Sequence, residues 1–227
     1  MRDAATNPIQ QRWVYHCSHT GDRFIVPDGC RDLLHFSTPG ERPRWSLSPL
    51  QSGVMAARLT EGTTVVGYRL VPGVELPEAV LPHLLDVAED DPDHSVTRVL
   101  DDVRLDPRAG EALATVAALS MTVAGAAGAI GASRRTLERL PVRHTGNPPV
   151  FWSQLARVRA VARALARGAE PLETAYEMRY ADQAHLSRSV RRWFGVSRSE
   201  LVRRPDLSQQ LFSPGYDAVT GEQISTR

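Results

Sequence analysis

The chain has 227 residues, of which 42% are hydrophobic, so it is long enough for one or two domains with a substantial core. No run of about 18 apolar residues occurs, and the first residues lack the apolar stretch of a signal peptide, so we expect a cytoplasmic protein without a membrane partner. The only cysteines are Cys17 and Cys30, which excludes a disulfide framework and provides no Cys-x-x-Cys zinc pair.

Charge is distributed unevenly, although the net charge is only +1. Residues 1–133 hold 11 arginines against 17 acidic residues, whereas residues 134–204 hold 15 arginines against 6 acidic residues, a net charge of +9. The chain has no lysine, so this basic surface consists of guanidinium groups, which can bind a phosphate or a guanine edge with two hydrogen bonds. This distribution favours a nucleic-acid-binding C-terminal half, and a merely solvated arginine surface is the alternative.

The first 70 residues contain short runs of β-branched and aromatic residues that predict strands. Pro27 and Gly29 are turn residues between the second and third runs, so these two runs are expected to pair as a hairpin. A short helix over 78–87 and an acidic, poorly patterned stretch over 89–93 follow. The runs are 13–15, 24–26, 33–36, 54–56 and 65–70.

After Pro107 the chain becomes alanine-rich with helical periodicity. Helices are expected over 123–130, from a cap at Ser133, from Pro149 to Gly168, over 171–178, from a cap at Asp182 to Phe194, and after a capping box at 197–200. The sequence thus predicts an α+β fold: a β-rich sheet or barrel-like domain over 1–104, an all-α domain over 105–204, and a flexible polar tail over 205–227.

Two parts of the helical region share one pattern. In each, a tight turn leads to a capping residue and a short helix, with arginines on the face opposite its leucines. The caps, Ser133 and Asp182, lie 49 residues apart. Helices of this kind fit the major groove of DNA, so the duplication predicts two DNA-reading helix-turn-helix units.

Residues 122–203 resemble the DNA-binding domain of the AraC/XylS family of bacterial transcription regulators. The resemblance is carried by residues 180–188 (YADQAHLSR) and 191–197 (RRWFGVS), and in the first unit by 131–140 (GASRRTLERL) and 143–146 (RHTG). Residues 26–34 and 66–73 resemble, more weakly, an uncharacterised β-rich domain that precedes this module in some regulators.

The resemblance implies a regulator without enzymatic activity, cofactor or bound metal. Its two units, joined by a long helix, would enter successive major grooves about 34 Å apart. Double-stranded DNA is the expected partner, and RNA polymerase, a small-molecule effector and a second copy of the chain are further partners that such a function allows. The N-terminal domain would sense a signal or mediate dimerisation.

Carried over position by position, two sets of residues are expected to contact DNA. Helical spacing places leucines and Val190 on the inward face, opposite these sets. His185 has a packing role beside the turn as its alternative. The residues expected to contact base edges are Arg135, Glu138, Arg139, Gln183, Ala184 and Arg188, and those expected to contact the backbone are Arg134, Thr136, Arg143, His185, Ser187, Arg191 and Arg192.

The sequence departs from the family pattern at three positions. Pro141 replaces a large apolar residue, and because proline lacks a backbone donor we expect the first recognition helix to end or kink at Leu140. Arg179 replaces a glycine in the second turn, where a positive φ is common. Arg198 replaces a usual proline.

Two other functions remain open from the sequence. A thiol- or metal-dependent sensor or enzyme would use Cys30 or Cys17 with nearby histidines, although strand alternation directs His16 and Cys17 to opposite faces. Cys30 follows a turn expected to be exposed, which favours a sensor thiol, with a packing residue as the alternative. An interaction protein with a degenerate first unit is the third hypothesis. The candidate metal ligands are His16, Cys17, His19, Cys30 and His35.

Overall fold

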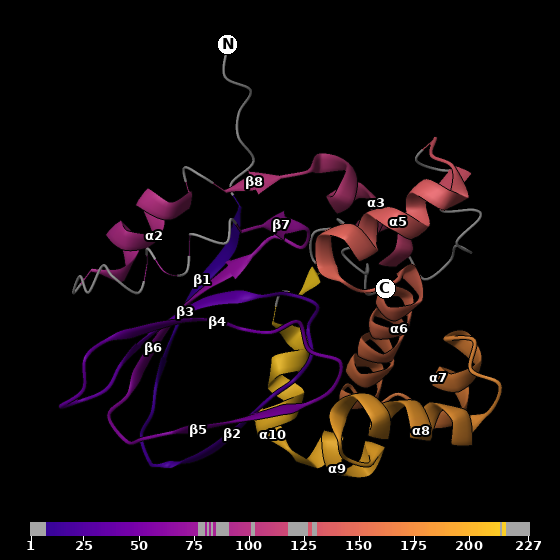
Figure 1. Cartoon of the computed structure of the whole chain (residues 1–227). Coiled ribbons are helices and arrows are strands. Elements are labelled where there is room, and N and C mark those ends of the chain that lie inside the picture. The colour runs from indigo at the N-terminus through magenta and orange to yellow at the C-terminus, as the bar shows by residue number, and fades with distance from the viewer. Residues whose placement is uncertain are drawn as a thin grey trace.

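A computed structural model of the chain describes residues 8–76, 80, 82, 84, 91–100, 103–117, 127–128, 131–213 and 215–216. Strands dominate residues 8–76, and helices dominate the described residues after them, where β8 is a two-residue strand between α2 and α3; this order agrees with the predicted α+β fold (Figure 1). The strands are β1 (Ile9–His16), β2 (Gly21–Ile25), β3 (Asp32–Ser37), β4 (Arg44–Leu47), β5 (Met55–Leu59), β6 (Thr64–Leu70), β7 (Val74–Glu75) and β8 (Arg104–Leu105). The helices are α2 (Pro92–Leu100), α3 (Pro107–Ala117), α5 (Arg134–Thr145), α6 (Pro149–Ala166), α7 (Pro171–Glu177), α8 (Gln183–Phe194), α9 (Arg198–Arg203), α10 (Pro205–Ser208) and the 3-10 helix η1 (Gln209–Phe212).

The described strands form open antiparallel sheets rather than a closed barrel. A four-stranded sheet has the order β1-β6-β3-β4, β2 pairs with β5, and β7 pairs with β8. Trp13 of β1 lies opposite Gly67 of β6, and a Cβ at Gly67 would stand 2.1 Å from the indole of Trp13. Glycine is therefore the residue that lets this large ring lie across the central strand.

The predicted hairpin between the second and third runs is wrong. β2 pairs with β5, and β3 pairs with β4 and β6, so the Pro27–Gly29 turn carries the chain from one sheet to the other. Gly29 does have the positive φ (77°) that its place in a turn suggests. The ring of Tyr216 occupies the space that a Cβ at Gly29 would need, at 2.4 Å. Both the positive φ and the close approach of Tyr216 thus require glycine at this position.

The buried residues form two clusters. One lies on the four-stranded sheet and includes Leu33, Trp45 and Tyr68. The other is built around α6 and holds the inward faces of α5 and α8. Val26 and Cys30 of the β-rich half belong to this second cluster, so the helical core extends into the turn between the sheets.

Most predicted helices of the C-terminal half are present within two residues of their expected ends. The helices expected over 78–87 and 123–130 lie largely outside the described residues. A helix that was not predicted, α2 (Pro92–Leu100), begins at the end of the acidic stretch, whose residues 89 and 90 lie outside the described residues. None of the helices in the described ranges is long and apolar enough to span a lipid bilayer.

The expectation of a flexible tail from residue 205 is wrong for the described residues 205–213 and 215–216. Pro205–Ser208 and Gln209–Phe212 are helical, and the side chains of Leu207, Leu211 and Tyr216 are at most 1% exposed. The segment looks like a tail because most of its residues are polar, but Leu207, Leu211 and Tyr216 are buried in the helical core.

Candidate DNA-binding interface

The first recognition helix, α5, begins at its predicted cap, Ser133, and is also capped at its carboxyl end. The Ser133 hydroxyl accepts the Thr136 N–H at 3.1 Å, and Gly146 ends the helix with a φ of 75°. Leu137 is fully buried and Leu140 packs against the helical core. The opposite face is exposed and carries Arg134, Arg135, Thr136, Glu138, Arg139 and Arg143.

Pro141 does not end this helix. The helix continues for four residues beyond it to Thr145, so the expected end at Leu140 is wrong. The proline ring is buried, and the turn that follows is held by the Thr145 hydroxyl, which donates to the Pro141 carbonyl at 2.6 Å, and by the Gly146 N–H, which donates to Val142. Burial of the ring and these bonds offset the missing N–H, and the exposed face extends to Arg143.

Two candidate contacts on α5 are already paired with each other. The Arg134 guanidinium lies 2.8 Å from the Glu138 carboxylate, one turn away. Arg135, Arg139 and Arg143 follow at four-residue intervals and so form roughly one line along the helix. This line of exposed arginines gives the outer face of the first unit its positive charge.

The second recognition helix, α8, has the same design. Asp182 accepts the His185 N–H at 2.6 Å, and Gly195 ends the helix with a φ of 70°. Leu186 and Val190 are fully buried. Ala184, His185, Arg188, Arg191 and Arg192 are exposed on the opposite side, and Gln183 and Ser187 are half-buried.

Gln183 has a protein partner that the sequence analysis did not foresee. With its amide oxygen turned toward α9, that oxygen lies 2.7 and 3.1 Å from the Arg198 guanidinium nitrogens. Arg198 is the residue that departs from the family's proline, so this departure creates the contact. The Ser187 hydroxyl is also engaged, because it donates to the Gln183 carbonyl at 2.9 Å.

The turn before α8 is built around Tyr180. Arg179 has a φ of 55°, as its place in the turn predicts, and it is the one non-glycine residue with positive φ in the described part of the chain. The His185 ring packs edge-on against Tyr180 at 5.0 Å, and the Arg157 guanidinium of α6 lies 4.9 Å from the same ring. His185 therefore has the packing contact that was its alternative role, on an exposed side chain.

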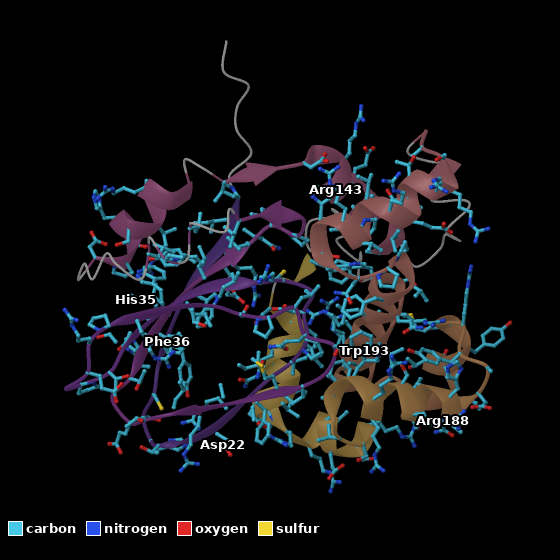
Figure 2. The ribbon with its side chains drawn as sticks, viewed as in Figure 1. Asp22, His35, Phe36, Arg143, Arg188 and Trp193 are labelled. Atoms are coloured by element: carbon cyan, nitrogen blue, oxygen red, sulfur yellow. The ribbon has the colours of Figure 1, made fainter. Side chains whose placement is uncertain are left out.

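The long helix α6 separates the two recognition helices. Its 18 residues correspond to a length of about 27 Å. α5 and α8 lie toward opposite ends of it, as do Arg143 and Arg188 (Figures 1 and 2). The long linking helix predicted from the sequence is thus present between α5 and α8.

Cys30 is not exposed, contrary to the expectation for a residue after a surface turn. Its side chain is 4% exposed, and burial raises the pKa of its thiol well above the ordinary value. Cys17 is buried as well. Within the described ranges, no three His, Cys, Asp or Glu residues come together as metal ligands. Cys30 is therefore a packing residue of the helical core, which was the alternative to a sensor thiol.

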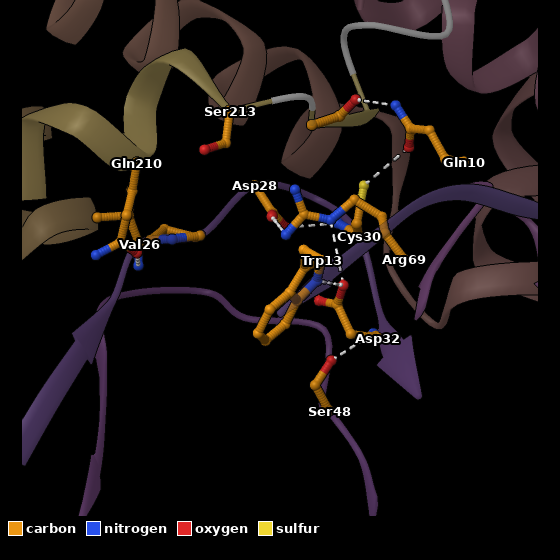
Figure 3. Close-up of polar contacts among 12 residues, drawn as sticks. Gln10, Trp13, Val26, Asp28, Cys30, Asp32, Ser48, Arg69, Gln210 and Ser213 are labelled. Carbon is orange, nitrogen blue, oxygen red and sulfur yellow. Dashed lines mark hydrogen bonds and ion pairs between the residues drawn. The ribbon is translucent and has the colours of Figure 1, made fainter. Parts of the chain in front are cut away.

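A buried ionic cluster beside Cys30 escaped the sequence analysis. The Arg69 guanidinium lies 2.6 Å from Asp28 and 3.3 Å from Asp32, and Asp32 also accepts the Trp13 indole N–H at 3.0 Å (Figure 3). Burial raises the pKa of Asp28, and the charge of Arg69 opposes that rise. Asp28, Asp32 and Arg69 stand in the two N-terminal motifs, residues 26–34 and 66–73, which pair in space through β3 and β6.

Comparison with known proteins identifies the C-terminal region. Residues 126–204 match the family described as a helix-turn-helix domain. No curated protein sequence matches the chain. Among solved structures, the C-terminal domain of the response regulator AraT from Geobacillus stearothermophilus aligns with 20% identity and a TM-score of 0.36, over 43% of this chain and 82% of that one.

ToxT from Vibrio cholerae aligns with 11% identity and a TM-score of 0.46, over 85% of this chain and 97% of that one. At TM-scores below 0.5, neither likeness carries the assignment, which depends on the family match and on the capped helices described above. Residues 126–204 of this chain are a helix-turn-helix domain of the AraC type.

Proposed function

We propose that the protein is a transcription regulator that binds double-stranded DNA in a sequence-specific manner, with α5 and α8 entering successive major grooves. One observation carries this proposal: each of these helices has a fully buried leucine, Leu137 in α5 and Leu186 in α8, and leaves arginines exposed on its other side. A helix needs that combination to be held by its own domain while its outer side chains reach base edges.

The proposed base contacts follow from the chemistry of the exposed side chains. Arg135, Arg139 and Arg188 can each bind the O6 and N7 atoms of guanine, and the Ala184 methyl group can contact the methyl group of thymine. Glu138 can accept from cytosine N4, with Arg134 beside it to offset repulsion by phosphates. Gln183 can read adenine only by giving up its contact with Arg198.

The proposed backbone contacts come from side chains around the same helices. Arg143, Arg191 and Arg192 are exposed near the carboxyl ends of α5 and α8, where they can bind phosphates and set the register. Arg134, Thr136, His185 and Ser187 complete this set. With a net charge of +9 over residues 134–204, affinity should fall steeply as salt concentration rises.

Selection from a randomised duplex library, followed by footprinting of the full chain on the selected duplex, tests the proposal. We expect one sequence motif and two protected major grooves on one face, about 10 base pairs apart. Protection of a single groove would restrict reading to one unit. Failure to enrich any sequence would overturn the proposed function and favour the interaction-protein hypothesis.

A further inference from the structure

The described residues of the C-terminal segment, 205–213 and 215–216, lie between the β-rich half and the helices of the DNA-binding domain (Figure 1). We call this segment the strap. Its buried side chains Leu207, Leu211 and Tyr216 belong to the same cluster as Trp193 and Phe194 of α8. The strap therefore packs on the domain that carries the second recognition helix.

Hydrogen bonds join the strap to the β-rich half. The Gln210 side chain accepts the Val26 N–H at 3.0 Å and donates to the Phe24 carbonyl at 2.8 Å. The Tyr216 N–H donates to the Asp28 carbonyl at 2.9 Å, and Gln10 donates to the Gly215 carbonyl at 3.0 Å. Figure 3 shows Gln210 beside Val26 at this junction. All four contacts join residues more than 180 positions apart.

Arg159 of α6 is a buried residue that joins the helical domain to both the β-rich half and the strap. Its side chain is fully buried, and its guanidinium donates to the Pro27 carbonyl at 3.0 Å and to the Leu211 and Ser213 carbonyls at 3.4 Å. Arg163, one turn later, donates to the Leu211 carbonyl at 2.8 Å. Hydrogen bonds from a charged donor are stronger than neutral ones, so α6 is held firmly at this junction.

The β-rich half also touches α8 directly. The Val54 N–H, in the loop between β4 and β5, donates to the Trp193 carbonyl at 3.1 Å in the last turn of α8. Two contacts thus fix the carboxyl end of the second recognition helix. One is the hydrogen bond from this loop, and the other is the helical core to which the strap contributes its buried side chains.

We propose that the strap positions the second recognition helix for DNA, with Gln210 as the positioning residue that ties the β-rich half to the domain carrying α8. This inference rests on the proposed function. Ala184, Arg188 and Arg191 stay exposed in the strapped arrangement, so docking does not cover the reading face. Holding α8 in one orientation removes the entropic cost of ordering it when DNA binds.

The test compares Gln210→Ala with Gln209→Ala in the full chain. Gln209 is the exposed neighbour of Gln210 and provides a control for helix propensity and charge. On the selected duplex, Q210A should bind about fivefold more weakly than Q209A, because two hydrogen bonds across the junction are lost. On a random duplex of equal length, the two variants should bind equally, since phosphate contacts tolerate a less defined orientation.

Amide hydrogen exchange in the absence of DNA gives a second readout. The Val54 N–H should exchange about tenfold faster in Q210A than in Q209A, because local opening of the junction exposes it. Equal exchange rates together with equal selectivity would overturn the positioning role. If the unaltered chain selects no sequence, the proposed function fails and the claim about DNA fails with it, whereas selection by the unaltered chain with no difference between the variants refutes the strap alone.

Discussion

Leu137 and Leu186 occupy equivalent places in the two recognition helices. Each stands four residues after the capping residue of its helix, and each is fully buried. The two leucines hold α5 and α8 on the same core from different ends of α6. The sequence pattern that occurs twice therefore corresponds to two helices that pack on the core in the same way.

Truncation of Leu186 should therefore destabilise the protein strongly. We expect Leu186→Ala to lower the free energy of unfolding by about 2–5 kcal/mol, through lost burial and the cavity left behind. Urea denaturation of the variant measures this loss. Val142→Ala is the control, since Val142 is 45% exposed on α5 and its truncation should change stability by about 0.5 kcal/mol or less.

Arg188→Ala tests direct reading by α8. Binding to the selected duplex should weaken by about 1–3 kcal/mol while binding to a random duplex changes little, because the arginine is expected to recognise a guanine edge. Titration of both duplexes at one fixed salt concentration checks this. Arg42→Ala, an exposed arginine in the β-rich half, should leave both affinities unchanged. An equal loss on both duplexes would assign Arg188 to phosphate.

Arg179→Gly should stabilise the turn before α8. A side chain at a φ of 55° is strained, and glycine removes that strain at the cost of a more flexible unfolded chain, for a net gain of about 0.5–1 kcal/mol. The same substitution at Arg143, an exposed position inside α5, should instead cost about 1 kcal/mol. Thermal denaturation compares the two. A lower melting temperature for R179G would show that the arginine makes a stabilising contact there.

Asp93 should contribute to stability in a way that depends on pH. Its hydrogen bonds with Arg12, at 2.7 Å, and with the Tyr68 hydroxyl, at 2.6 Å, hold the pKa of the carboxyl below its ordinary value. A lowered pKa stabilises the folded state above about pH 4 and loses that effect as the pH falls through the folded-state pKa. Asp93→Asn should thus be less stable than the parent at pH 7, and the difference should shrink toward pH 2.

Cys30 should behave as a buried thiol. Because burial raises its pKa, we expect slow alkylation in the folded protein and fast alkylation after denaturation, and mild peroxide should leave DNA affinity unchanged. Cys30→Ala serves as the reference for peroxide effects elsewhere. Rapid modification of Cys30 with a change in affinity would restore the thiol-sensor hypothesis.

Local signals predicted most of the helical half correctly. The caps Ser133 and Asp182, the glycine at 195 and the capping box at 197–200 act within one turn of the chain, and the structure has all of them. The exposed arginines also follow from helical spacing alone. The effect of Pro141 was misjudged because burial of its ring is a tertiary contact.

The incorrect predictions concern features that depend on contacts between segments that are separate in the sequence. The partner of β2 is β5 rather than its neighbour β3, and no local residue pattern encodes that choice. The segment after Pro205 looked like a polar tail because its buried residues are separated by polar ones. Gln183 looked available to DNA because its contact with Arg198 crosses from α8 to α9.

The placement of Tyr216 against Gly29 has a consequence for biosynthesis. The helical core joins residues near position 30 to Leu207, Leu211 and Tyr216, so it can close only after the segment around Tyr216 has left the ribosome. Contacts of such long sequence separation slow folding and prolong the exposure of apolar surface. The helices formed earlier in the chain therefore keep part of their apolar surface exposed until the segment around Tyr216 has been synthesised.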